Sequence, residues 1–208
     1  MLDVLIFAAT SFMIGLSGAM APGPLLTVTI SDSLKKGSRT GPLLVLGHVI
    51  GEVFIILLIL AGLGWLIASS LASTLIGLVG GVVMIFMGLS MMRDTSLEVE
   101  VGGFEDFGSV SKGLVTSVSN PYFFIWWGTI GAALMLKGME LAKLAGLAAF
   151  LIGHWSSDFA WYSIVSFFSS RGKLVLRGGY RFIIVACGIF LIAVGLYFII
   201  ASSLAQII

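Results

Sequence analysis

The sequence has few charges: 10% of its 208 residues are charged, whereas soluble domains carry about 25%. It has a single cysteine, Cys187, so no intrachain disulfide can form, and we interpret Cys187 as a small apolar core residue. Its 11 basic and 10 acidic residues nearly balance, and no basic stripe is interleaved with aromatic residues. The composition therefore argues against nucleic acid as a partner and leaves no room for a separate soluble domain.

Apolar residues are abundant instead: they make up 59% of the chain and give a mean hydropathy of +1.14. A bilayer crossing takes about 20 apolar residues. Clusters of glycine, serine and charged residues divide the chain into six apolar runs. We therefore expect an all-α integral membrane protein in a lipid bilayer. Its six transmembrane helices are predicted over residues 4–31, 41–67, 71–92, 111–136, 141–168 and 180–204.

The first run is predicted to be a retained helix. Ala19-Met20-Ala21 resembles a signal-peptide cleavage site, but Asp3 is the only charged side chain before the run and Pro22 would follow the cut. A signal peptide needs a basic segment ahead of its apolar stretch.

Basic residues in short loops indicate orientation, because they are enriched on the cytoplasmic side. Nine lie on one side of the predicted spans, and two, Lys137 and Lys143, lie on the other. An even number of spans then places both termini outside, in a multi-pass protein of the cytoplasmic (inner) membrane. The nine are Lys35, Lys36, Arg39, Arg93, Lys112, Arg171, Lys173, Arg177 and Arg181.

Two matching pairs of ionisable residues lie deep in apolar runs: Gly47-His48-x-x-x-Glu52 and Gly153-His154-x-x-x-Asp158. Side chains four residues apart share one face of a helix. A charged group in hydrocarbon costs at least a few kcal/mol. The pairs therefore indicate a functional site.

The two halves of the chain resemble each other. The His/acid pairs align at an offset of 106 residues, and Gly81 and Gly88 align with Gly188 and Gly195 at an offset of 107. Three spans per half would insert the second half from the opposite side, the inverted-repeat design of secondary transporters. We predict repeats over 1–92 and 111–208, joined by a cytoplasmic acidic linker over 93–110. That linker is either a solvated connection or a vestibule that attracts cations.

Proline interrupts the first span of each half, at Ala21-Pro22-Gly23-Pro24 and at Ser119-Asn120-Pro121. The offset between Pro22 and Pro121 is 99, which fits the repeat less well and indicates either an amphipathic start to the fourth span or divergence. A helix that restarts inside a membrane offers free N–H groups to a substrate carboxylate. The alternative is a kink that only shapes packing. The predicted substrate-binding residues are Ala21, Pro22, Gly23, Asn120, Pro121, Tyr122 and Trp126.

Three interpretations of the His/acid pairs remain open. The first is a structural network in which His48 bonds Glu52 and His154 bonds Asp158. The second is proton coupling by all four residues, because histidine and a desolvated carboxylate can exchange protons near neutral pH. The third is a metal site of His48, Glu52, His154 and Asp158, a ligand set that suits zinc or manganese.

The glycines of Gly47-x-x-x-Gly51 and Gly77-x-x-x-Gly81 are predicted to let helices approach closely.

The Pro-Gly-Pro break, the Asn-Pro break, the six spans and the length resemble the LysE/RhtB family of amino-acid exporters, over essentially the whole chain. The resemblance implies efflux of amino acids or related small metabolites by proton antiport, with Glu52 at a position where members tend to carry an acid. Members that export basic amino acids tend to have an acid five residues beyond the Asn-Pro proline, where this chain has Trp126. A neutral substrate is therefore favoured over a cationic one.

We therefore expect a membrane transporter without a bound cofactor, working by alternating access as one repeat rocks against the other, with protons as the coupling ion. A divalent-metal exporter is the alternative. A remote alternative is an intramembrane serine hydrolase built on Gly15-Leu16-Ser17-Gly18 with His154 as base. Homo-oligomerisation is left open.

Overall fold

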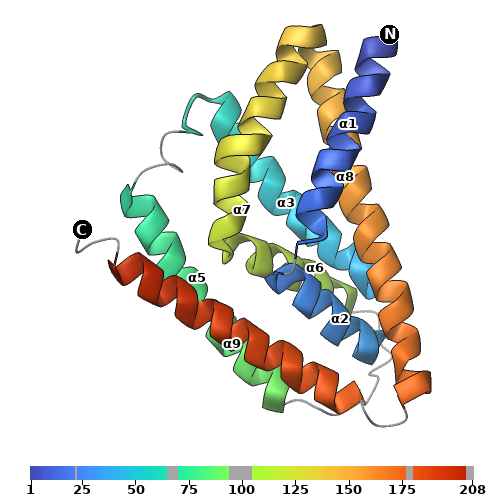
Figure 1. Cartoon of the computed structure of the whole chain (residues 1–208), viewed down its shortest axis with the longest axis vertical. Coiled ribbons are helices and arrows are strands. Elements are labelled where there is room, and N and C mark those ends of the chain that lie inside the picture. Colours follow the sequence, from blue (N-terminus) through green and yellow to red (C-terminus); the bar gives the residue numbers. More distant parts are fainter. Residues whose placement is uncertain (22, 65–69, 94–104, 177–179, 205–208) are drawn as a thin grey trace.

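The computed structural model describes residues 1–21, 23–64, 70–93, 105–176 and 180–204. Throughout these residues the chain is helical, with no strand (Figure 1). By length and apolar composition, three of the described helices could cross a bilayer: Leu2–Ala19, Thr40–Leu60 and Arg181–Ser203. A shorter apolar stretch covers Thr74–Ser90. The protein is thus an all-helical membrane protein in its described part, and the arrangement of six spans stays a prediction.

The first half of the chain contains a broken helix followed by two long ones: α1 (Leu2–Ala19), α2 (Pro24–Lys36), α3 (Thr40–Leu60) and α5 (Ser70–Arg93). The break falls at the proline motif, as predicted, although Pro22 itself lies outside the described residues. Gly23 caps α2 and Pro24 occupies its first turn, where a missing N–H costs no helical hydrogen bond.

The second half also begins with a broken helix: α6 (Glu105–Val118), α7 (Pro121–Trp126), the π-helix η1 (Trp127–Gly131), α8 (Ala132–Leu176) and α9 (Tyr180–Leu204). Asn120 caps α7, because its side chain accepts a hydrogen bond of 3.1 Å from the Tyr122 N–H. Helix α6 begins within the predicted linker, at Glu105. The rest of that linker, residues 94–104, lies outside the described part.

The spans predicted over 111–136 and 141–168 place the turn between them at residues 137–140, beginning at Lys137-Gly138. It lies instead at Ala142 and Lys143, where α8 loses helical geometry and the chain reverses (Figure 1). Lys143 has a positive φ of 50°. Gly138 instead packs across this hairpin, since a Cβ on it would lie 2.7 Å from the Gly146 carbonyl oxygen. The glycine permits close packing of two helices rather than the turn.

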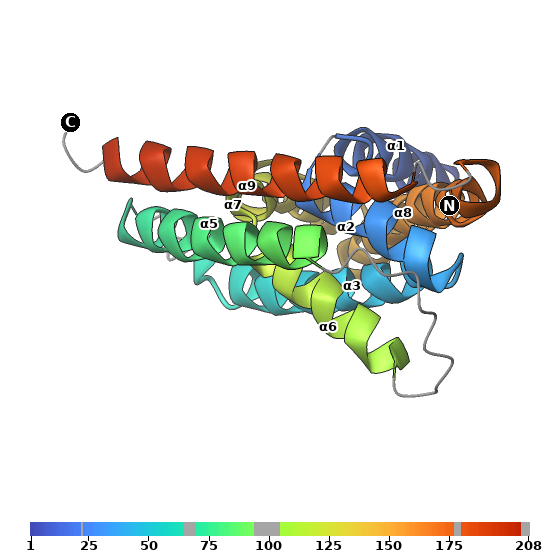
Figure 2. The same ribbon diagram turned by 90° about the horizontal axis from the view of Figure 1, so that it is seen from below.

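Helix α5 lies along α9, and the two run side by side on one flank of the molecule (Figure 1, Figure 2). Glycines let their backbones touch: a Cβ on Gly81 would lie 2.6 Å from the Gly195 carbonyl oxygen, and one on Gly88 would lie 2.5 Å from that of Gly188. These glycines are the ones that align between the two halves of the sequence.

Two further helix pairs are interlocked in the same way, α1 with α8 and α3 with α6. A Cβ on Gly153 of α8 would collide with the Ala8 carbonyl oxygen of α1, and a Cβ on Gly47 of α3 would collide with the Val110 carbonyl oxygen of α6. The packing role predicted for Gly47 and Gly81 is therefore confirmed. Helix α3 also contacts α8, so the two helices that carry the His/acid motifs pack against each other.

Candidate functional site

A cavity of about 280 Å³ lies beside the two helix breaks. Helices α1, α2, α3, α6, α7, α8 and α9 all contribute to its wall, together with η1 and the residues of the two breaks. Pro121 is not part of the wall, and Pro22 lies outside the described residues. The other predicted site residues line it: His48, Glu52, His154, Asp158, Ala21, Gly23, Asn120, Tyr122 and Trp126.

The four ionisable residues come together, but not as two separate pairs. His48 Nε2 lies 3.1 Å from Glu52 Oε1 on its own helix, and His154 Nε2 reaches across from α8 to the same oxygen at 2.9 Å. Asp158 Oδ2 is farther away, at 3.6 Å from His154 Nε2 and 4.0 Å from His48 Nε2. The structural-network interpretation predicts a bond between His154 and Asp158, but His154 bonds Glu52 instead, because the packing of α3 against α8 brings this acid closer.

Glu52 lies at the centre of the cluster and is almost fully buried, with 1% of its surface exposed. Besides the two imidazoles, the Trp127 indole N–H donates to Oε1 at 3.2 Å and the Trp155 indole N–H donates to Oε2 at 2.9 Å. Both carboxylate oxygens therefore accept hydrogen bonds. Such a set of donors suits an ionised carboxylate, since a buried charge is tolerated when it is paired and hydrogen-bonded.

Asp158 differs from Glu52 although it is equally buried, with 2% exposed. Its Oδ2 has no hydrogen-bond partner among the described residues. A buried polar atom without a partner costs on the order of 1–3 kcal/mol. Because Asp158 lines the cavity, a bound proton or ligand could satisfy this oxygen.

The second ring nitrogens of the histidines also differ. His48 Nδ1 shares a hydrogen bond of 2.7 Å with Ser117 Oγ, on α6. His154 Nδ1 is buried and has no partner in the described part of the chain. Gly15 of α1 lies against it, so that a Cβ there would be 2.7 Å from Nδ1.

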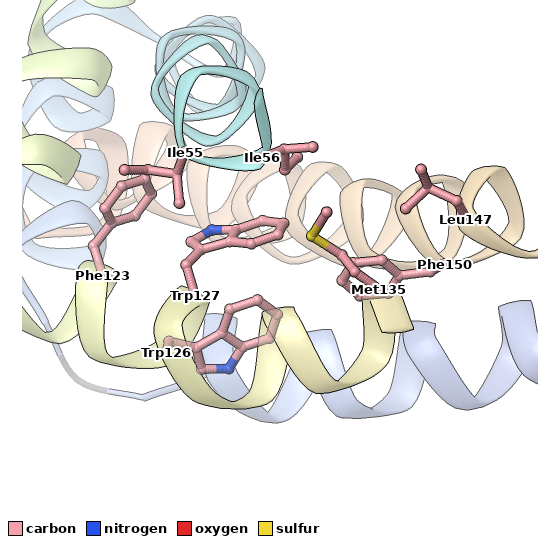
Figure 3. Packing of buried hydrophobic residues seen from close by; sticks show 8 residues of the cluster. All are labelled: Ile55, Ile56, Phe123, Trp126, Trp127, Met135, Leu147 and Phe150. Carbon is pink, nitrogen blue, oxygen red and sulfur yellow. The ribbon is translucent and has the colours of Figure 1, made fainter. Parts of the chain in front are cut away.

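Aromatic residues enclose His154 and fix its ring plane. Trp126 stacks on the imidazole with a centroid distance of 4.6 Å, and Phe150 stacks at 5.8 Å. Figure 3 shows the cluster to which both belong, with Trp127 between Ile55 and Ile56 of α3 on one side and Trp126 on the other. The π-helix begins at Trp127, and such bulges commonly occur at functional sites.

The sequence patterns did not point to the partners of Glu52. Trp155 follows His154 directly but had no recognisable role, and Ser117 is one serine among several in its helix. The contacts of Trp127 and Trp155 with Glu52 depend on how distant helices pack.

Comparison with known proteins places this chain in a family. The family model described as LysE type translocator matches residues 16–202. The chain belongs to the LysE type translocator family. The resemblance seen in the sequence is thereby confirmed, and membership supports transport of small molecules across a membrane rather than catalysis.

One curated relative of this LysE type translocator is the chemotactic transduction protein ChpE of Pseudomonas aeruginosa. It is 26% identical over 154 residues, which cover 73% of this chain and 76% of ChpE. No solved structure matches the chain.

A metal ion could be held by part of the cluster. Ligand atoms of His48, Glu52 and Asp158 all lie within 4.8 Å of one another. The donor set of imidazole and carboxylate suits zinc or manganese. However, both Glu52 oxygens already accept hydrogen bonds, so a metal bound there would share this carboxylate with indole and imidazole groups.

The serine hydrolase motif has no catalytic geometry in this translocator. Ser17 is exposed, and its hydroxyl donates a hydrogen bond of 2.7 Å to the Ile14 carbonyl. The residue of that motif beside His154 is Gly15, which has no nucleophile.

Proposed function

We propose that this LysE type translocator exports amino acids or related small metabolites, neutral ones in preference to cationic ones, by proton-coupled alternating access. The observation that carries the proposal is the buried Asp158 carboxyl oxygen, which has no hydrogen-bond partner among the described residues and lies in the wall of a cavity beside two imidazoles. Intramembrane ionisable residues of this kind mark ion pathways and proton relays. Asp158 and Glu52 take up and release protons, and His48 and His154 relay or tune them.

The substrate carboxylate would bind at the helix breaks. Gly23 caps α2 at the cavity wall, and the first turn of a helix offers N–H groups that favour an anion. Trp126 and Phe123 provide an apolar wall, which fits a neutral side chain. The Tyr122 N–H is already bound by Asn120, so α2 is the better of the two anion sites.

The architecture we propose is six spans in two inverted repeats, in the inner membrane with both termini outside. The glycine contacts support a twofold relation between the halves. In sequence, Gly81 aligns with Gly188 and Gly88 aligns with Gly195. In space, Gly81 contacts Gly195 and Gly88 contacts Gly188. Crossed contacts of this sort are expected when two copies face each other across a twofold axis.

The test is a counterflow screen in proteoliposomes, with amino acids and divalent metals offered with and without a pH gradient. We expect counterflow of a neutral amino acid that a pH gradient accelerates, and loss of that acceleration in the double variant Glu52→Gln with Asp158→Asn. Unchanged gradient-driven transport in the double variant would rule out the proton assignment. Absence of counterflow for every amino acid would overturn the substrate class.

A divalent-cation exporter is the second candidate, and the trio of His48, Glu52 and Asp158 is the observation that favours it. In that case manganese or zinc would raise the thermal stability of the purified protein, and His48→Ala would remove the effect. The same screen would then show metal counterflow in place of amino-acid counterflow.

A further inference from the structure

Helix α2 differs from its neighbours in being both short and buried while carrying many polar residues. Its buried residues are Pro24, Leu25, Thr27, Val28, Thr29, Ser31, Asp32, Ser33 and Leu34. Its first residues line the cavity, and its last turn holds Lys35 and Lys36. The helix therefore extends from the cavity to the end of the molecule where Lys35 and Lys36 lie, and it fills the space between them.

Among the described residues, the polar side chains along the middle of α2 make no hydrogen bonds to neighbouring helices. Thr27 donates to the Gly23 carbonyl at 3.0 Å and Thr29 donates to the Leu25 carbonyl at 2.8 Å, both within α2. Ser31 Oγ has no partner among the described residues. Hydroxyls that bond their own backbone are satisfied without a neighbour, so this part of α2 can shift without breaking polar contacts.

Leu25 and Val28 pack in an apolar cluster with residues of α3, α8 and α9, whereas the polar contacts of α2 with other helices lie at its C-terminal end. Lys112 of α6 donates to Asp32 at 2.7 Å, and Ser33 shares a hydrogen bond of 2.7 Å with Ser166 of α8. Ser166 also accepts from the Gly41 N–H at 3.0 Å and so holds the start of α3. We call the contacts Asp32–Lys112 and Ser33–Ser166 the latch.

The latch consists of polar contacts that water can replace only if α2 moves. The Lys112 side chain is 45% exposed, whereas that of Asp32 is 5% exposed. A buried carboxylate is destabilised when it loses its partner without gaining water, so the ion pair opens together with a movement of α2 that exposes Asp32. Ser33 and Ser166 are neutral groups, and their hydroxyls can exchange this bond for bonds to water.

The three glycine-interlocked pairs are different. Each joins one helix of the first half to one of the second: α1 to α8, α3 to α6 and α5 to α9. If the halves rocked against each other, all three interfaces would have to separate or slide. The close packing opposes this motion, because backbone carbonyls of the facing helix fill the space at Gly47, Gly81 and Gly153.

We propose that α2 is the moving gate of the transport cycle, closed by the latch, while the three interlocked pairs stay together. This replaces rocking of one half against the other and rests on the transport function proposed above. Opening the latch lets α2 swing away from α6 and α8, and the cavity then opens toward the end that carries Lys35 and Lys36. The part of α2 that lines the cavity moves with it, which couples the gate to the substrate.

The test uses two engineered disulfides in a Cys187→Ala background. The first, Ser33→Cys with Ser166→Cys, closes the latch covalently; the serine oxygens are 2.7 Å apart, so the geometry allows a bond. We expect substrate counterflow when the pair is reduced, its loss after oxidation, and its recovery after addition of a reductant. Counterflow that persists after complete oxidation would overturn the gate.

The second pair, Gly77→Cys with Ser202→Cys, is the matched control, because it also links the two halves but within α5 and α9. A Cβ on Gly77 would lie 3.1 Å from Ser202 Cβ. The proposal predicts that this oxidised pair still transports, whereas rocking of the halves predicts that it does not. Blocked transport here would overturn the proposal, and absence of transport in both reduced proteins and in the Cys187→Ala parent would count against the transport function instead.

A labelling experiment keeps the proposal testable if a cysteine pair fails to fold. Ser31→Cys places one thiol on the buried part of α2, where Ser31 is 0% exposed. We expect a charged methanethiosulfonate reagent to label it several-fold faster when Lys112→Ala breaks the ion pair. An unchanged labelling rate would contradict the latch.

Discussion

The two His/acid motifs have the same spacing and similar burial, but their surroundings differ. On α3, Glu52 accepts from two indoles and lies within 3.1 Å of two imidazoles. On α8, Asp158 has an oxygen with no partner in the described structure. The motif of the first half thus holds its carboxyl group by hydrogen bonds at both oxygens, whereas that of the second half leaves one carboxyl oxygen without a hydrogen bond.

The helix that packs against each motif shows a second difference. Ser117 of α6 bonds His48 Nδ1, while Gly15 of α1 leaves His154 Nδ1 unpaired. Val110 contacts Gly47 as Ala8 contacts Gly153, so Ser117 and Gly15, each seven residues further along its helix, are in corresponding places. We infer that the two halves have different roles. The His48 ring is held at both nitrogens, whereas the His154 ring is held at one.

The largest effect on stability is expected for Glu52→Gln. The substitution removes a carboxylate that accepts from two indoles and contacts two imidazoles, and hydrogen bonds to a charged group contribute about 1.5–3 kcal/mol each to the free energy of unfolding. Thermal unfolding in detergent measures it, with the exposed Glu140→Gln as control. Equal midpoints for the two variants would show that Glu52 does not organise the cluster.

Gly15→Ala should have the next largest effect. Its Cβ would lie 2.5 Å from Ser157 Oγ and 2.7 Å from His154 Nδ1, and overpacking costs about 1–3 kcal/mol. Gly108→Ala is the control, because nothing lies within 4 Å of a Cβ there. The same thermal measurement should show a loss for Gly15→Ala and none for the control; the opposite order would refute the close contact of α1 with His154.

Ser117→Ala should be milder, since it removes one hydrogen bond to His48, worth about 0.5–1.5 kcal/mol. Ser203→Ala is the control: Ser117 donates to the Gly113 carbonyl at 2.7 Å and Ser203 donates to the Ile199 carbonyl at 2.8 Å, each four residues back, but of the two only Ser117 also bonds a histidine side chain among the described residues. We expect the two variants to differ in the pH dependence of counterflow, which a purely local helix effect would not change. Identical pH profiles would remove Ser117 from the site.

Local rules predicted the parts of the site that lie within one helix. Residues four apart share a face, and proline ends a helix, so the His/acid motifs and both breaks were found from the sequence. The register of α3 against α8 is not local, and it decides that His154 meets Glu52 rather than Asp158. The position of the α8 turn was missed because a lysine-glycine pair looks the same in a turn as in a packed helix.

Asp158→Asn should change stability least and transport most specifically. Its Oδ2 makes no hydrogen bond in the described structure, so the amide replaces no existing acceptor there and the thermal midpoint should stay close to that of the unmodified protein. An amide cannot bind and release a proton near neutral pH, so counterflow should persist while a pH gradient no longer drives uptake. Glu140→Gln serves again as the control and should keep its response to the gradient. If Asp158→Asn destabilised the protein as much as Glu52→Gln, the two acids would be equivalent structural members of one network. The inference that the two halves have different roles would then be wrong.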